Sequence, residues 1–216
     1  MSCSLTGKLS ITALAFLLSL NAPMMSYGQS AKDVMNKMRD VLRKEKEISI
    51  SYEQSFSWKS SKSVSKTAGK LDMKDLKKLR LQTDEQTLVS NGNVLWTYST
   101  FTNQVVITLI DKSGGTILPN DFLNEYPKDY NLKLLDEDKF EGEYLILLTP
   151  KDKSSFVTAI KIWLDDEDYL IRGIEYKDIN GNVTLWEVTE LDIEPNFDES
   201  HFEFKKPPGA EVVDLR

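Results

Sequence analysis

Cysteine is almost absent from this 216-residue chain, because Cys3 is the only one and it lies before the apolar run at residues 9–20. A lipid-anchored bacterial protein has its cysteine directly after such a run, so we expect no lipid anchor. Beyond this run the chain has no thiol with which to form a disulfide. Export without disulfides is typical of a bacterial envelope protein rather than of a eukaryotic secreted module.

Histidine is equally scarce, because His201 is the only one. Without a second histidine or a later cysteine, a zinc site is not expected, and we expect the His201 side chain to be exposed. The Gly-x-Ser-x-Gly motif of a nucleophilic serine is also missing. The sequence therefore favours a protein that has no metal or cofactor and is not an enzyme. A hydrolase of lipid or glycan with an unusual carboxylate pair is the alternative of another class.

Only one long apolar run is present, at residues 9–20, and Lys8 is the only charge before it. Small residues then lead to a cleavage site near Gly28. This pattern predicts a secretory signal peptide over residues 1–28 and an exported, periplasmic single domain over residues 29–216. The run is too short for a transmembrane helix, and no later segment is long enough.

Basic residues are outnumbered, with 27 Lys and Arg against 34 Asp and Glu and a net charge of −7. Removal of the signal peptide would take away Lys8 and no acid, which leaves −8. Nucleic acid and anionic membrane surfaces are therefore not expected as partners, and we expect a monomer. The acidic clusters at 136–138 and 165–168 lack the alternation and glycine of a calcium loop, so we expect solvated turns.

An amphipathic helix is predicted over residues 31–46, with an apolar stripe that includes Val34, Met38 and Leu42 and with Ser30 as N-cap. The period changes to two from Ile48 onward, which indicates a long half-buried strand. Strand-like segments then recur along the chain: 48–58, 64–73, 78–83, 86–90, 93–99, 103–110, 130–136, 143–149, 157–164, 169–177, 182–192 and 200–205. About ten or eleven short strands predict a mainly β fold, a curled, unclosed antiparallel half-barrel.

Two features suggest an apolar cavity inside this sheet. A short helix at about 117–126 is available, with the helix at 31–46, as a lid over the opening. The Asn91-Gly92 turn predicts a hairpin whose second strand places Trp96 and Tyr98 on one face. Periodicity leaves open whether these rings belong to an ordinary core or to a pocket.

The order of several motifs resembles the periplasmic outer-membrane lipoprotein carrier (LolA) family across nearly the whole chain after the signal peptide. Each motif is weak alone, but their order is specific. The matching segments are Tyr52–Phe56, Val89–Gly92, Leu95–Tyr98 with Gln104, Leu148–Lys151 and Phe202–Asp214.

This resemblance implies a half-barrel with a helical lid that carries the acyl chains of lipoproteins from the inner to the outer membrane. The implied partners are acylated lipoproteins as cargo, an inner-membrane exporter complex and an outer-membrane acceptor. A lipid- or lipoprotein-sensing regulatory module with the same fold is the alternative. The residues expected to contact lipid are apolar: Leu79, Leu81, Trp96, Tyr98, Phe101, Leu118, Phe122 and Leu123.

One position departs from the family pattern. The family has an arginine–proline pair after the strand that here ends near Met73, and that arginine holds the lid. In this chain the pair aligns with Asp75 and Leu76. A carboxylate accepts hydrogen bonds where a guanidinium donates them, so the lid must be held differently.

Overall fold

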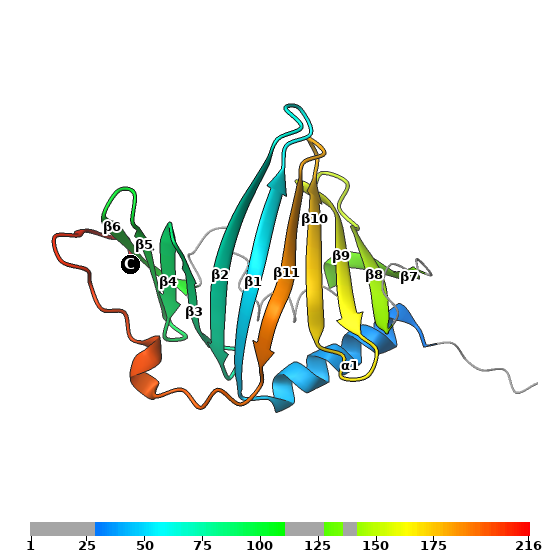
Figure 1. Cartoon of the computed structure of the whole chain (residues 1–216), viewed down its shortest axis with the longest axis horizontal. Coiled ribbons are helices and arrows are strands. Elements are labelled where there is room, and N and C mark those ends of the chain that lie inside the picture. Colours follow the sequence, from blue (N-terminus) through cyan, green and yellow to red (C-terminus); the bar gives the residue numbers. More distant parts are fainter. Residues whose placement is uncertain (1–28, 111–127, 136–141) are drawn as a thin grey trace, which may run out of the picture.

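Twelve strands form one sheet in the part of the chain that the computed structural model describes, residues 29–110, 128–135 and 142–216 (Figure 1). Their order is β12-β6-β5-β4-β3-β2-β1-β11-β10-β9-β8-β7. All neighbours are antiparallel except β12 and β6, which are parallel. The strands are β1 (Glu47–Ser57), β2 (Val64–Lys74), β3 (Lys78–Thr83), β4 (Gln86–Ser90), β5 (Val94–Ser99), β6 (Gln104–Leu109), β7 (Tyr130–Leu135), β8 (Glu143–Pro150), β9 (Val157–Asp165), β10 (Ile171–Asp178), β11 (Val183–Asp192) and β12 (Glu211–Asp214).

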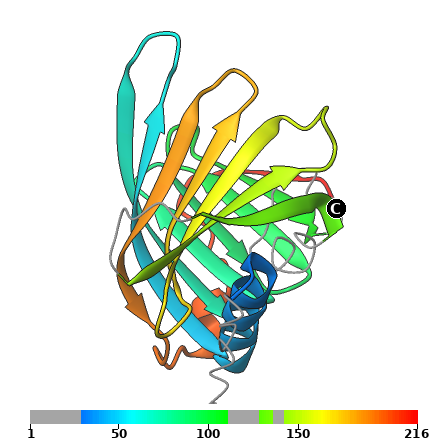
Figure 2. The ribbon, with the colours of Figure 1, turned by 90° about the vertical axis from the view of Figure 1, so that its right-hand side faces the viewer.

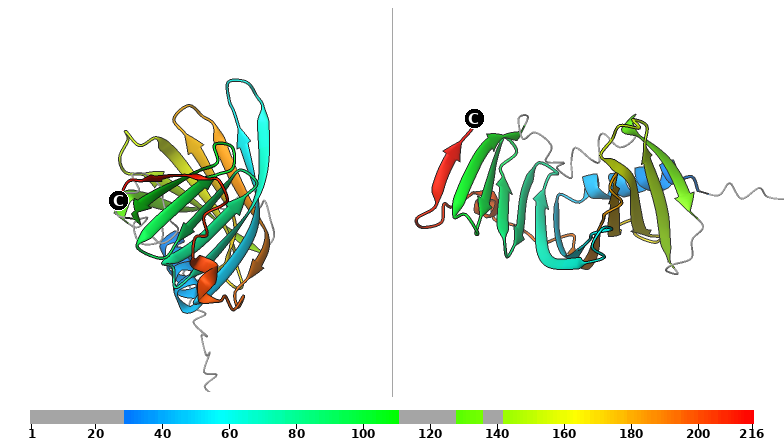
Figure 3. Two further views of the ribbon diagram at one scale, coloured as in Figure 1. Left: turned by 90° about the vertical axis from the view of Figure 1, so that its left-hand side faces the viewer. Right: turned by 90° about the horizontal axis from the view of Figure 1, so that it is seen from above.

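The sheet curls into a trough whose two edge strands lie far apart, as the view from above shows (Figure 3). Within the described residues, no ladder joins β7 to β12. The predicted unclosed half-barrel is therefore confirmed. The predicted signal peptide at 1–28, the short helix at 117–126 and the acidic cluster at 136–138 lie outside the described residues.

The helix α1 (Ala31–Lys44) lies in the trough, against the concave face of the sheet (Figure 2). Ser30 caps it as predicted: its hydroxyl accepts from the Asp33 N–H at 3.2 Å, and the Asp33 carboxylate accepts from the Ser30 N–H at 3.3 Å. Val34, Met35 and Met38 are fully buried against strand residues of the core. The amphipathic helix predicted from the apolar period is thus confirmed, two residues shorter than expected.

The register shows which residues share each face of the sheet. Ile50, Leu71 and Leu81 are cross-strand partners on the concave face. Side chains alternate along a strand, so the neighbouring Asp72 and Arg80, which pair with each other, point to the convex face.

The chain after β11 crosses the convex face before it reaches the sheet edge (Figure 1). We call residues 193–210 the C-terminal strap. The predicted strand over 200–205 is wrong, because the 3₁₀ helix η2 (Glu199–Phe202) begins there, capped by Asp198, whose carboxylate accepts from the Ser200 N–H at 2.8 Å. The last strand is β12 instead, which pairs with β6.

The turn between β2 and β3 has an uncommon backbone. Asp75 and Leu76 have φ values of 52° and 53°, in the left-handed region that favours glycine. The Asp75 N–H donates to the Lys46 carbonyl at 2.6 Å, and the half-buried Leu76 packs against the core to which α1 contributes. At the position of the family's arginine, this chain therefore places a strained tight turn and an apolar contact.

We expect Asp75→Gly to raise the free energy of unfolding by about 0.5–1 kcal/mol, because glycine adopts a positive φ without the Cβ clash. Urea denaturation measures the change. Asp84→Gly is the matched control, since Asp84 is an exposed turn residue with a negative φ. Its free energy of unfolding should fall by about 0.5–1 kcal/mol, because glycine gives the unfolded chain more conformational entropy. A change of the same sign and size in both variants would show that the backbone at Asp75 is not strained.

Candidate functional site

An apolar cavity of about 270 Å³ lies between the concave face of the sheet and the C-terminal half of α1. It is lined by Leu42 of α1 and by residues of β1, β2, β3, β10 and β11, among them Ile171, the first residue of β10. Strand residues that line it are Ile50, Tyr52, Leu71, Met73, Leu81, Gly173, Ile174, Tyr176, Trp186, Val188 and Leu191. A concave, mostly apolar hollow with few polar groups is the usual form of a ligand site.

The polar side-chain groups of this lining are the hydroxyls of Tyr52 and Tyr176 and the indole N–H of Trp186. Burial raises the pKa of Tyr52, and it raises the pKa of Tyr176 to about 12, so both stay neutral hydrogen-bond donors. Within the described residues, neither hydroxyl has a hydrogen-bond partner. The Tyr176 ring lies edge-on to Trp186, with centroids 5.0 Å apart. The cavity therefore offers free donors on an aromatic wall.

Two strand glycines leave room for the aromatic rings of this region. A Cβ at Gly69 would lie 2.4 Å from the Tyr52 hydroxyl, so any larger residue there would displace that ring. A Cβ at Gly173 would lie 3.4 Å from the Trp163 ring. The sequence reasoning missed both positions, although an isolated glycine within a strand pattern signals such a close approach.

The structure separates the residues that were expected to contact lipid. Leu81 lines the cavity, and Leu79 lies beside it in the buried core with α1. Phe101 is 96% exposed in the β5–β6 turn and does not line the cavity. Leu118, Phe122 and Leu123 lie outside the described residues.

The expectation that Trp96 and Tyr98 face the cavity is wrong. Trp96 pairs with Val89, which pairs with Arg80, so all three lie on the convex face. The Trp96 ring stacks on Phe204 of the C-terminal strap, with centroids 6.2 Å apart. Tyr98 lies on the same face, because it pairs with Thr87, and its hydroxyl donates to the Asn103 side chain at 3.1 Å. The alternation was read correctly, but the face that the two side chains share is the convex one.

The C-terminal strap is fastened to the convex face by ion pairs at its middle. The Lys74 ammonium lies 2.9 Å from Glu47 and 2.7 Å from Glu199, and Lys78 also pairs with Glu199. Hydrogen bonds from Lys74 and Lys78 lower the pKa of Glu199 to about 2. The strap therefore covers this face with both charged and apolar contacts.

His201 takes part in this fastening, so the expectation of an exposed histidine is wrong. Its Nε2 lies 2.7 Å from the Asp72 carboxylate, and its ring stacks on Phe197 at 4.6 Å. The other Asp72 oxygen accepts from the Ser49 hydroxyl at 2.7 Å. The carboxylate stands between serine and imidazole, so this histidine is not placed to take the serine proton, as a nucleophilic triad requires.

A second hollow of about 480 Å³ lies between the strap and the convex face of the sheet. Polar and charged side chains make up much of its wall, among them Arg80, His201, Glu203 and Lys205. An apolar ligand would gain little from leaving water there, although the hollow is larger than the concave one. The concave cavity is the better candidate site.

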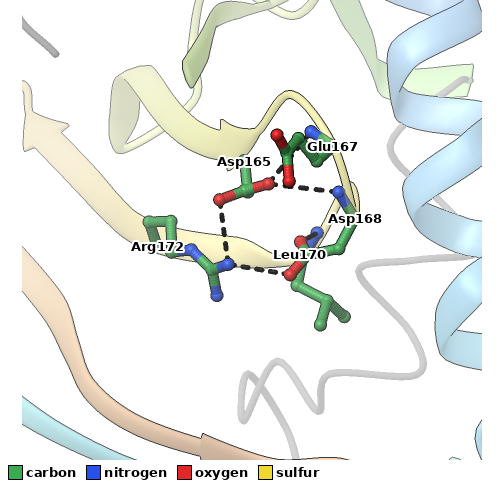
Figure 4. Close-up of polar contacts among 5 residues, drawn as sticks. All are labelled: Asp165, Glu167, Asp168, Leu170 and Arg172. Atoms are coloured by element: carbon green, nitrogen blue, oxygen red, sulfur yellow. Dashed lines mark hydrogen bonds and ion pairs between the residues drawn. The ribbon is translucent and has the colours of Figure 1, made fainter. Parts of the chain in front are cut away.

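The acidic cluster at 165–168 forms a closed turn, as expected (Figure 4). Asp165 accepts from the N–H groups of Glu167 and Asp168, and Asp168 accepts from that of Leu170. Arg172 bridges the two carboxylates at 2.9 and 2.8 Å. These bonds satisfy the carboxylates of Asp165 and Asp168 within the turn, and the described residues hold no group of three His, Cys, Asp or Glu that could bind a metal.

Polar contacts hold the N-terminal end of α1 to the neighbouring strands and turns. Lys37 donates to the Tyr169 hydroxyl at 2.8 Å, and Tyr169 stacks on Tyr144 at 5.9 Å. Tyr144 donates to Gln29 at 2.9 Å. The other end of α1 packs on the core through Leu42 and continues after two residues into β1.

None of the helices in the described residues has the length and apolar character needed to cross a membrane. A family model described as outer membrane lipoprotein carrier protein LolA matches residues 43–205. The chain is 28% identical over 213 residues to an outer-membrane lipoprotein carrier protein of Glaesserella parasuis, which covers 97% of this chain and 96% of that protein.

A carrier protein of Pasteurella multocida is 25% identical over 194 residues, covering 85% of this chain and 88% of its own length. A solved structure of an uncharacterized conserved protein from Thermus thermophilus shares the fold, with a TM-score of 0.59 at 14% identity, over 85% of this chain and 98% of that chain. The family model spans most of the sheet that forms the cavity. The chain belongs to the LolA family of outer membrane lipoprotein carrier proteins.

Proposed function

We propose that this protein is a periplasmic carrier that takes up the acyl chains of lipoproteins in the concave cavity and moves them from the inner to the outer membrane. The apolar cavity on a LolA-family sheet carries this proposal. Each buried methylene contributes roughly 0.8 kcal/mol, so even partial burial of acyl chains supplies a useful affinity.

The two tyrosines of the wall suit the head of an acyl chain. Tyr52 and Tyr176 are neutral donors inside an apolar lining, and an acyl ester or amide carbonyl is an acceptor that has lost its water. A hydrogen bond from either hydroxyl would offset the desolvation of such a carbonyl. The cavity therefore suits an acylated ligand better than a plain hydrocarbon.

The helix α1 is the element whose displacement would enlarge the cavity. Leu42 is its one residue on the cavity wall, and this end of α1 stays with the sheet because only two residues separate Lys44 from the start of β1. The contacts of Lys37 and Gln29 hold the other end, and breaking them would let α1 swing about its junction with β1. Donor and acceptor are an inner-membrane exporter complex and an outer-membrane acceptor, and residues 1–28 direct export and are removed.

Purification of the protein from the periplasm is expected to recover bound lipoproteins that mass spectrometry detects. A lipoprotein whose acylated cysteine is replaced by serine is the control, and it should not co-purify because it has no acyl chains. Recovery of the protein without any lipoprotein, even from cells in which release to the acceptor is blocked, would contradict the carrier proposal.

A further inference from the structure

The tips of three neighbouring hairpins form one rim of the trough, and they point the same way (Figure 2). They are the β1–β2 tip, the β8–β9 loop and the β10–β11 tip. Hydrogen bonds join them: Lys59 N–H donates to the Asn182 side chain at 3.1 Å, and Ile179 N–H donates to the Phe156 carbonyl at 2.9 Å. We call residues 58–66, 151–156 and 177–182 the rim.

Large apolar side chains are exposed on each tip of the rim. Phe156 is 63% exposed and Ile179 is 62% exposed, while Trp58 and Val64 on the β1–β2 tip are also exposed. These residues gather at one end of the molecule, away from the packed core around α1. Grouped exposed apolar residues of this kind mark an interaction surface.

Lysines surround these apolar residues. Exposed lysines of the rim are Lys59, Lys62, Lys66, Lys151, Lys153 and Lys177. Of these, Lys59, Lys62, Lys66, Lys153 and Lys177 form no ion pair within the described residues. The acids of the rim are Asp152 and Asp178, and each carboxylate already accepts hydrogen bonds from its own loop. The rim is therefore locally basic although the chain carries −7 overall.

Two segments rich in acidic residues lie at the opposite end of the sheet. The acidic turn at 165–168 and the chain between 190 and 199 lie at the other ends of the same strands (Figure 1). Exposed charges farther apart than about 8–10 Å are largely screened at physiological salt, so the local charge of the rim decides what approaches it. The net charge of the whole chain therefore does not decide by itself whether an anionic membrane surface attracts the rim.

A mostly aromatic track joins the rim to the cavity. Tyr52, Gln54 and Phe56 occupy alternate positions along β1 and so share the concave face, and the Trp58 ring just beyond the strand lies against Phe56. Tyr52 lines the cavity, and the Phe56 and Trp58 rings are 4.4 Å apart. An apolar chain that left a surface held at the rim would meet aromatic side chains on its way inward.

We propose that the rim is a docking surface for an anionic lipid bilayer, with lysines on the headgroups and Trp58, Phe156 and Ile179 inserted at the interface. Aromatic and apolar tips next to lysines match the two layers of a membrane surface. A bilayer also accepts three separate tips without a complementary shape. Docking holds the cavity mouth against the membrane that supplies or receives the acyl chains, and only this purpose rests on the proposed function.

Flotation with vesicles that contain no lipoprotein tests the docking separately from the carrier activity. The full mature protein is expected to float with vesicles of 30% phosphatidylglycerol in phosphatidylcholine at 50 mM salt. Pure phosphatidylcholine vesicles should bind it much less, and 500 mM salt should weaken the binding. Lys66→Gln with Lys153→Gln should lower the partition coefficient roughly 20-fold or more, about fivefold per lysine.

Matched variants away from the rim are the controls. Lys205→Gln with Lys206→Gln removes the same charge from exposed lysines of the strap, and it should leave flotation unchanged. Phe156→Ser should reduce binding. Phe101→Ser removes a ring that is even more exposed, 96% against 63%, from a turn whose Thr100 hydroxyl donates to the Asp84 and Glu85 carbonyls, and it should leave binding unchanged. A wild-type protein that does not bind the anionic vesicles at 50 mM salt would overturn the proposal, and an acidic protein would then be the partner that fits the rim. Equal losses in control and rim variants would overturn it as well.

Discussion

Replacing Leu81 by aspartate is expected to lower the affinity for an acylated lipopeptide by at least about a hundredfold. Leu81 lies on the cavity wall between Leu71 and Leu88 in the register. A carboxylate there must either keep its water, which fills the cavity, or lose it at a cost of several kcal/mol. Each 1.4 kcal/mol is a factor of ten in affinity. Titration with a palmitoylated lipopeptide measures the loss.

The neighbouring Gln82→Asp is the matched control, because Gln82 is on the same strand but points to the convex face. It should bind the lipopeptide as the wild type does. Leu81→Trp separates charge from space, since it keeps the wall apolar but fills part of the 270 Å³ and should weaken binding less than aspartate. Unchanged binding in a folded Leu81→Asp protein would show that acyl chains do not occupy this cavity.

Replacing Phe202 by alanine is expected to lower the free energy of unfolding by about 3–5 kcal/mol. Phe202 is 1% exposed and packs edge-on against Phe197 and His201, while η2 lies on β3. Loss of this ring leaves a cavity under the C-terminal strap and weakens the position of His201 on Asp72. Thermal or urea unfolding measures the change.

Phe101→Ala is the control for this substitution, because the ring is 96% exposed and its loss should change stability by less than about 0.5 kcal/mol. Trp96→Ala, on the same convex face as the strap, should also destabilise the protein and leave lipopeptide binding at native temperature unchanged. A Trp96→Ala protein with native stability and lost binding would contradict the separation of the two faces.

Local periodicity predicted most of this fold because it reports burial directly. The strand from Ile48 has its apolar side chains at alternate positions, and Ile50 and Tyr52 do line the concave face. The helix start at Ser30 was readable because the capping box is local to four residues. The structure near the end of the chain could not be read in this way. The helix η2 depends on its cap Asp198 and on contacts with strands that lie more than a hundred residues earlier in the sequence.

The candidate site was harder to predict for a reason that Trp96 illustrates. Alternation says which side chains share a face, but it does not say which face meets the cavity when both faces carry apolar residues. The strap covers the convex face through Phe202 and Phe204, and no pattern around Trp96 signals that layer. In the same way, the partner of His201 is Asp72, which lies 129 positions away in sequence.

Because no ladder joins β7 to β12 in the described residues, the width of the trough is not fixed by ring closure. In a closed barrel, strand number and shear set the radius, so widening it breaks hydrogen bonds. In the described part of this chain the two edges are unpaired with each other, and the sheet can flatten by a small change of twist at each of its ladders. On the proposed carrier function, this would let the trough enclose cargo of different bulk while every backbone hydrogen bond of the wall is kept.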